Sequence, residues 1–162
     1  SKSLLGFYFF WGRMWKQKNS NQNITVENFV KQLWISFFSF KDLDLSQLMH
    51  YGHVKGWLED QDERDFSAFI DKRTAARIVH MFTKLELHLP DAEDISGAEV
   101  LQDLYTCRVC ANHVAQVFVK GFMNSEEFLQ DDKVVELFNM NRLLLEKEAI
   151  HIIKKIQDFC SI

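Results

Sequence analysis

A motif of residue types occurs twice in this sequence, and such an internal repeat constrains the fold more than any other feature of the chain. Each copy has an apolar residue, one spacer, Asp and Leu, then a helix ending in Gly and an aromatic residue, a polar loop, and the start of a second helix. A shortened copy opens the chain. The copies contain Gly12 and 24–29; Phe40, Asp42, Leu43, Gly56-Trp57 and 70–76; and Leu101, Asp103, Leu104, Gly121-Phe122 and 144–150. We therefore predict one domain, 1–162, with pseudo-repeats at about 1–38, 39–88 and 89–162.

Helical periodicity dominates the rest of the pattern. Apolar residues such as Phe29, Leu33 and Phe37 recur every three or four positions, while the alternation typical of strands is nearly absent. Thr25, Asp71, Ser96 and Ser125 are short polar residues that can accept from the first backbone N–H groups of a helix, and Ser96 with Glu99 has capping-box spacing. The fold class is therefore predicted to be mainly α. We expect helices at 25–38, 72–86, 107–120 and 146–158, and shorter ones at 4–15, 44–54, 96–104 and 126–138.

Composition narrows the class of protein. A hydrophobic fraction of 47% with 15 Phe and 4 Trp predicts an aromatic core. With only 1 Pro and 6 Gly, the sequence has no Gly-rich or Pro-rich linker that would separate two domains. The formal net charge of −4 supplies no basic field for a nucleic-acid backbone, so nucleic acid is not an expected partner. The most apolar stretch, 4–11, is shorter than the roughly 20 residues of a membrane-spanning helix, and we interpret it as a core helix.

The repeated motif resembles the S-layer-homology repeat, in which Phe-x-Asp-Val, a helix, Gly-Ile and a polar loop precede an Ile-Thr-Arg-Ala-Glu helix start. The resemblance covers nearly the whole chain. It implies three helix-loop-helix units around a pseudo-threefold axis, with grooves between them that hold anionic, pyruvylated cell-wall polysaccharide. It also implies a protein at the cell surface of a bacterium or secreted from it; without the resemblance we expect the cytoplasm.

Val26, Lys72 and Glu146 occupy the position of the motif arginine in the three repeats. Only Lys72 is basic, so the resemblance assigns ligand binding to Lys72, with Arg73 beside it and Trp57 as a ring for a sugar to stack on. The alternative is that Lys72 is a solvated lysine and Trp57 a core residue.

Cys107 and Cys110 open a predicted helix with Cys-x-x-Cys spacing, where the helix dipole and Arg108 favour a thiolate. They also fall near the aromatic position of the repeat's helix, and we interpret them as packing residues. A redox or disulfide pair and a zinc site are the alternatives. Zinc needs four ligands, and His113, six residues after Cys107, would point away from the pair on a helix.

Other candidate sites are weaker. The acidic run 59–65 lacks the Gly and Glu that a calcium loop requires, so a solvated loop is expected. Among six histidines only His50 and His53 have helical spacing, and no hydrolase, phosphate-binding or metalloprotease motif occurs. We therefore predict a binding module rather than an enzyme, without a cofactor, whose partner is a cell-wall glycan or a protein. A thiol-redox protein using Cys107 and Cys110 is the third hypothesis.

Overall fold

The computed structural model describes residues 21–39 and 44–161. The predicted helix at 4–15, Gly12, Phe40, Asp42 and Leu43 lie outside them. Within the described residues the chain is mainly helical, as predicted. The elements are α2 (Val26–Ile35), α3 (Leu45–Lys55), α4 (Asp60–Arg64), α5 (Lys72–Leu85), the 3-10 helices η1 (Ser96–Val100) and η2 (Leu104–Thr106), α6 (Arg108–Val119), β1 (Glu126–Gln130), β2 (Lys133–Leu137) and α7 (Glu146–Cys160).

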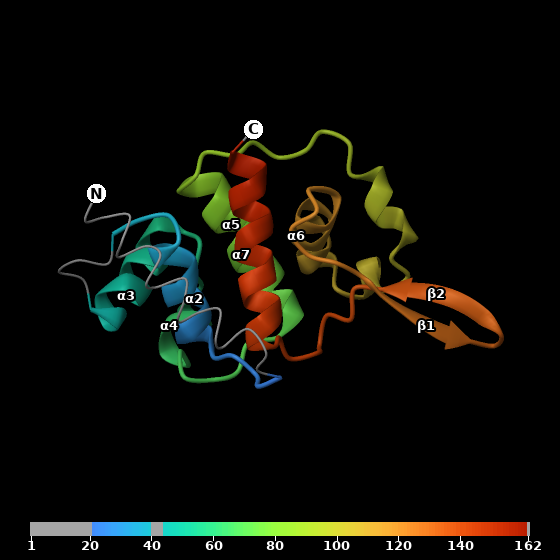
Figure 1. The fold of residues 1–162 in the computed structure, drawn as a ribbon, viewed down its shortest axis with the longest axis horizontal. Helices are drawn as coiled ribbons and strands as arrows, with labels where there is room; N and C mark the ends of the chain where they lie inside the picture. Colours follow the sequence, from blue (N-terminus) through green and yellow to red (C-terminus); the bar gives the residue numbers. More distant parts are fainter. Residues whose placement is uncertain (1–20, 40–43, 162) are drawn as a thin grey trace.

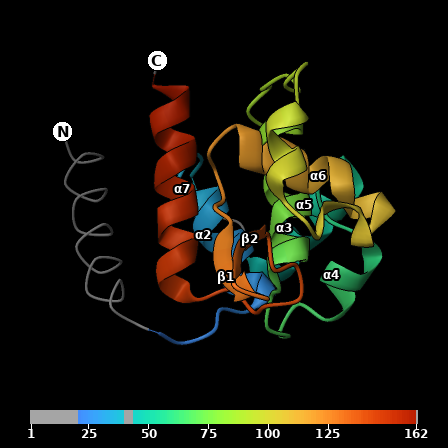
Figure 2. The same cartoon turned by 90° about the vertical axis from the view of Figure 1, so that its right-hand side faces the viewer.

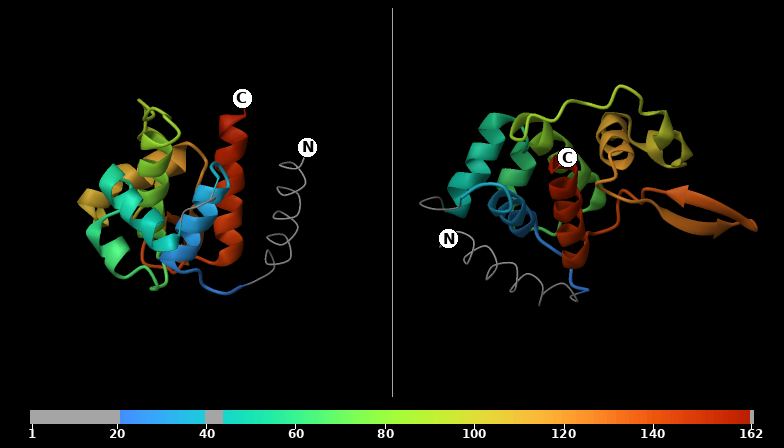
Figure 3. Two further views of the ribbon diagram at one scale, coloured as in Figure 1. Left: turned by 90° about the vertical axis from the view of Figure 1, so that its left-hand side faces the viewer. Right: turned by 45° about the horizontal axis from the view of Figure 1, so that its top comes forward.

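The helices form two groups on either side of α5 and α7. Figure 1 shows α2, α3 and α4 on one side and α6 with the two 3-10 helices on the other. The β1–β2 hairpin projects away from the helices, which the right-hand view of Figure 3 shows again. Figure 2, turned by 90°, places α7 along one edge of the described elements. None of the helices described here is long and apolar enough to cross a membrane.

Three short segments, which lead into α2, α5 and α7, meet in a closed ring of backbone hydrogen bonds. The N–H of Ile24 donates to the carbonyl of Leu144 (3.1 Å), that of Leu144 to Ile70 (2.9 Å), and that of Ile70 to Ile24 (3.0 Å). All three side chains are buried. A second set of bonds, each 2.9 Å, joins the same segments in the opposite cyclic direction: the N–H of Val26 donates to Ala68, that of Lys72 to Arg142, and that of Glu146 to Gln22. The N-termini of the three helices are thereby held together.

The predicted aromatic core lies among α2, α3 and α5. The ring of Trp57 meets that of Phe82 edge-on at 5.2 Å and stacks on that of Trp34 at 6.4 Å. Trp57, Phe82 and Phe29 expose 1% of their surface or less. Edge-to-face aromatic pairs stabilise a core beyond their buried area, by about 0.5–1.5 kcal/mol each.

Most of the predicted helices are observed, and two of the four predicted caps are confirmed. The side chain of Thr25 accepts from the N–H of Asn28 (3.3 Å), and that of Asp71 from the N–H of Thr74 (2.8 Å). The segment 96–104 instead contains the 3-10 helix η1 and the first residue of η2. Ser96 does not cap: its N–H and hydroxyl both donate to Asp94, an Asx-type turn that competes with α-helix formation.

The predicted helix at 126–138 is wrong, because this segment is an antiparallel hairpin with Glu126 opposite Leu137 and Gln130 opposite Lys133. Asp131 and Asp132 turn the chain with φ of 51° and 62°, the conformation of a tight two-residue hairpin loop, which Asp tolerates. Ser125 therefore caps no helix, and its hydroxyl donates to Glu136 (3.0 Å).

The acidic run contains α4 rather than a solvated loop. Its Asp62 is buried and accepts two hydrogen bonds of 2.8 Å from the guanidinium of Arg77 on α5. Charge-assisted hydrogen bonds of this kind allow a carboxylate to be buried. Asp62 is therefore buried although it belongs to a run of acidic residues.

A candidate binding pocket beside α7

A pocket of about 410 Å³ lies between the start of α5, the segment joining α6 to β1, and the first two turns of α7. Its lining combines apolar side chains with a small number of charged groups, as ligand-binding pockets commonly do. The lining residues are Lys72, Phe122, Met123, Asn124, Ser125, Glu126, Arg142, Leu144, Lys147, Glu148, His151 and Ile152.

Lys72 is the first residue of α5 and forms part of the pocket wall, although only 3% of its surface is exposed. Its Nζ donates to the carbonyl of Asn124 (3.0 Å), lies 3.4 Å from Glu126 Oε2, and sits 4.5 Å from the centre of the Phe138 ring. Burial lowers the pKa of Lys72, and the charge of Glu126 opposes that shift. Lys72 is therefore not a solvated lysine, and its ammonium is already held by protein groups.

Arg142 connects the two carboxylates of the pocket. Its guanidinium donates to both oxygens of Glu148, at 2.8 and 2.6 Å, and its Nε donates to Glu126 at 3.0 Å. The hydrogen bond with Glu148 raises the pKa of Arg142. Burial raises the pKa of Glu148, but hydrogen bonds from Arg142 and the Leu145 N–H outweigh it, so its pKa lies below the usual value. The Arg142 guanidinium thereby holds both carboxylates in fixed positions at the wall of the pocket.

Lys147 and His151 are exposed residues of α7 that also line the pocket. No hydrogen bond or ion pair joins either side chain to another of the residues described. With His151 neutral, the pocket holds three cations and two carboxylates, so it carries one surplus positive charge. The arrangement suits a small anionic, hydroxyl-rich ligand: the exposed ammonium of Lys147 attracts its charge, and the fixed carboxylates accept from its hydroxyls.

Trp57 and Arg73, the other two predicted ligand residues, do not line this pocket. Trp57 is in the aromatic core, where its Nε1 donates to Glu86 at 2.9 Å, so its ring has no open face for a sugar. Arg73 extends from α5 to the side chain of Asn141. Of the residues assigned by the resemblance, the structure brings only Lys72 to the pocket.

Sequence reasoning missed Arg142, Lys147 and His151 as pocket residues. One signal was available: Glu148 stands at the glutamate position of the repeat's helix-start motif, and its carboxylate accepts from the N–H of Leu145 (3.0 Å). Arg142 precedes the motif and belongs to no pattern. Its role depends on the hairpin that carries Glu126 to it.

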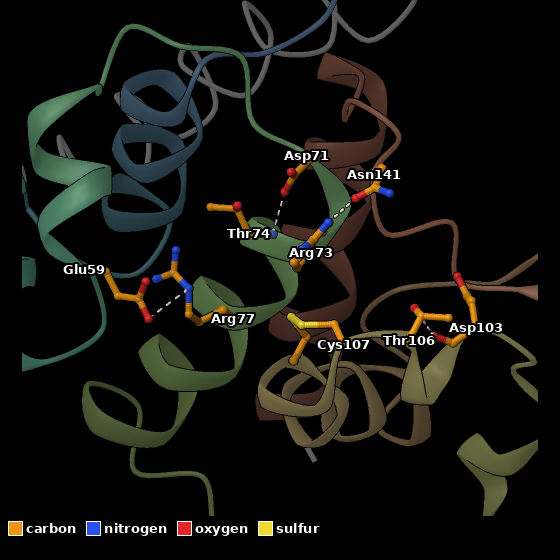
Figure 4. Close-up of a disulfide and its surroundings, with 10 residues drawn as sticks. Glu59, Asp71, Arg73, Thr74, Arg77, Asp103, Thr106, Cys107 and Asn141 are labelled. Carbon is orange, nitrogen blue, oxygen red and sulfur yellow. Dashed lines mark hydrogen bonds and ion pairs between the residues drawn. A yellow bond between two sulfur atoms is a disulfide. The ribbon is translucent and has the colours of Figure 1, made fainter.

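Cys107 and Cys110 are joined in a disulfide at the start of α6, on the side that faces α5 in Figure 4. Cys110 is buried and contributes to the core, whereas Cys107 is partly exposed. Within the described part of the chain, no group of three or more His, Cys, Asp or Glu side chains is arranged to hold a metal ion. The disulfide alternative is therefore present, and the packing interpretation holds as well, because Cys110 belongs to the hydrophobic core and Cys107 packs against it.

No protein-family model matches this sequence, and comparison with curated proteins and with solved structures gives no match either.

Proposed function

We propose that this protein is a non-enzymatic binding module built of three degenerate helix-loop-helix units around a pseudo-threefold axis, similar to S-layer-homology domains. Its ligand in this proposal is an anionic cell-wall polysaccharide, bound in the pocket beside α7. The ring at the helix N-termini supports the architecture. When the segments around Ile24, Ile70 and Leu144 are exchanged in cyclic order, each of the two sets of hydrogen bonds is reproduced, as a threefold axis requires.

The C-terminal ends of α3 and α6 support the proposed equivalence of the second and third units. Each helix is followed by a glycine of positive φ, 97° at Gly56 and 79° at Gly121, and each glycine precedes a fully buried aromatic residue. The N–H of Trp57 donates to Gly52 (3.1 Å) and that of Phe122 to Val117 (2.9 Å), so both helices end in the same kind of left-handed cap.

The position of Lys72 carries the functional part of the proposal. It is the one basic residue at the motif position that the resemblance assigns to ligand binding, and it lines a pocket between the second and third units. Because the Lys72 ammonium already has protein partners, we assign the first contact with a ligand carboxylate to Lys147 and His151. Lys72 then supplies buried positive charge behind them, which water screens little.

Sedimentation with cell-wall sacculi of Gram-positive bacteria tests the proposal, using sacculi with and without their accessory polysaccharide. We expect the protein to pellet only with sacculi that retain it. Lys147→Ala should weaken this binding, whereas Lys154→Ala removes the same charge from an exposed residue of the same helix outside the pocket and should not. Equal binding to stripped sacculi, or equal effects of both substitutions, would contradict the proposal.

A protein partner is the second candidate, and the projecting hairpin is the observation that favours it. Leu129 and Val134 face each other across the hairpin with 76% and 65% of their surfaces exposed. Exposed apolar residues side by side on a projecting element are typical of protein interfaces. Replacing both by Thr should leave sedimentation with sacculi unchanged under the first proposal.

A further inference from the structure

The disulfide at the start of α6 has the features of a site for thiol–disulfide exchange. Cys107 is the N-cap residue of this 12-residue helix and Cys110 lies in its first turn, with two residues between them. The two sulfurs differ in access, because Cys107 is partly exposed and Cys110 is 8% exposed. An incoming thiolate can therefore reach Cys107 and leave Cys110 as the departing group.

The surroundings favour a thiolate at Cys107 once the bond is reduced. In the oxidised protein no side chain caps α6, so a negative sulfur at the N-cap would meet the first N–H groups and the positive end of the helix dipole. Arg73 and Arg77 of α5 are among the residues around the disulfide in Figure 4. Arg77 is paired with Asp62, but Arg73 bonds to the neutral Asn141, and its Nε is buried without a hydrogen-bond partner.

The surface beside Cys107 suits a polypeptide. Val109, between the two cysteines, exposes 85% of its surface, and Tyr105, two residues before Cys107, exposes 69%. Exposed apolar groups next to a reactive sulfur give an unfolded or flexible chain something to pack on, whereas a disulfide that only staples the fold has no need of them.

We propose that Cys107 and Cys110 form a redox-active pair that exchanges disulfides with dithiol segments of other proteins. A substrate thiolate attacks Cys107 Sγ, the bond between the two protein sulfurs breaks, and its electron pair leaves with Cys110, which takes up a proton. The second substrate thiolate attacks the substrate sulfur of the mixed disulfide and releases Cys107. The substrate's two thiols are oxidised to a disulfide, and the protein's disulfide is reduced to two thiols with the same two protons.

The test uses the full chain in a Cys160→Ser background, because Cys160 is an exposed free thiol. Reduced protein is mixed with glutathione disulfide at pH 6, and the products are separated by mass. We expect the Cys110→Ser variant to accumulate glutathione on Cys107 at least tenfold faster than free cysteine does. The Cys107→Ser variant, which keeps only the buried sulfur, should react more slowly than free cysteine. Circular dichroism of both variants checks that they fold.

A second arm runs the proposed reaction in its forward direction. The oxidised Cys160→Ser protein is mixed with a reduced, unfolded dithiol protein, and we expect one substrate disulfide for each protein disulfide consumed. A folded Cys110→Ser variant whose Cys107 reacts no faster than free cysteine would overturn the proposal. So would a disulfide that remains intact in the folded protein under excess dithiothreitol.

Discussion

The rings of His80 and His113 meet nitrogen to nitrogen, with 2.8 Å between their Nδ1 atoms, where α5 packs against α6. The other nitrogen of His80 lies 2.7 Å from Asp91, which also pairs with Lys84. Two Nδ1 atoms this close can share only one proton, so the rings cannot both be protonated without breaking the contact. The pKa of His113 is lowered to about 4 by burial, and next by the positive charges of His80 and Arg77.

This pair should make stability depend on pH. His113 binds a proton near pH 6.5 in the unfolded chain and near pH 4 in the folded protein, so its contribution is complete above pH 6.5 and declines as the pH falls toward 4. Allowing for the partial exposure of His113, we expect the folded protein to lose about 1 kcal/mol between pH 7 and pH 5 through this residue. Urea unfolding at the two pH values measures it.

His113→Asn is the control, because the Asn amide can donate to His80 in place of Nδ1 and does not titrate. The difference between wild type and variant should shrink at pH 5 relative to pH 7. A constant difference would show that His113 does not carry the effect.

Asp103 holds the start of the segment that follows the hairpin. Its two carboxylate oxygens each accept a backbone N–H at 2.8 Å, from Phe138 and Asn139. Asp103→Ala removes two charge-assisted hydrogen bonds and should cost about 2–4 kcal/mol in the free energy of unfolding. Asp103→Asn keeps one acceptor and should cost less. Equal losses in the two variants, measured by denaturant unfolding, would argue against a role for the second bond.

Gly52 is required by close packing within α3. A Cβ at this position would lie 2.7 Å from Cδ1 of Leu58 and 2.8 Å from the ring of Trp57. Gly52→Ala should therefore destabilise the protein by more than about 2 kcal/mol, even though Ala favours helices. Gly97→Ala places its Cβ at an ordinary 3.6 Å from Val119 and should change the melting temperature little.

The ring at the helix N-termini should behave as one cooperative unit. The amides of Ile24, Ile70 and Leu144 each donate to the next segment, so no one of these bonds can open without loosening its neighbours. In native-state hydrogen exchange all three amides should exchange with the free energy of global unfolding. Early exchange of Ile24 alone would indicate that the first segment joins the other two only weakly.

The sequence predicted the helices well because their signals are local. Thr25 and Asp71 cap where expected, and the five longer helices that the structure describes lie close to predicted ones. The hairpin was missed because Glu126–Gln130 has little strand character of its own. Its signal was Asp131-Asp132, two residues that tolerate positive φ, followed by the β-branched Val134 and Val135.

The candidate site was less predictable, because a pocket forms from residues distant in sequence. Arg142 approaches Glu126 only after the hairpin folds back, and no spacing rule links residues 16 positions apart. An aromatic ring such as that of Trp57 can stack on a sugar, but Trp57 is buried against Trp34 of α2 and Phe82 of α5. Among the pocket residues, the resemblance predicted only Lys72, and the same motif offered a signal for Glu148.

The most direct test of the binding proposal is a calorimetric titration with soluble fragments of anionic wall polysaccharide, using wild type, Lys147→Ala and Lys154→Ala. We expect measurable binding by wild type, a loss of roughly tenfold in affinity for Lys147→Ala, since one charge-assisted contact contributes about 1.5–3 kcal/mol, and no change for Lys154→Ala. Binding that Lys147→Ala leaves unchanged, or an absence of binding by wild type, would contradict the assignment of this pocket.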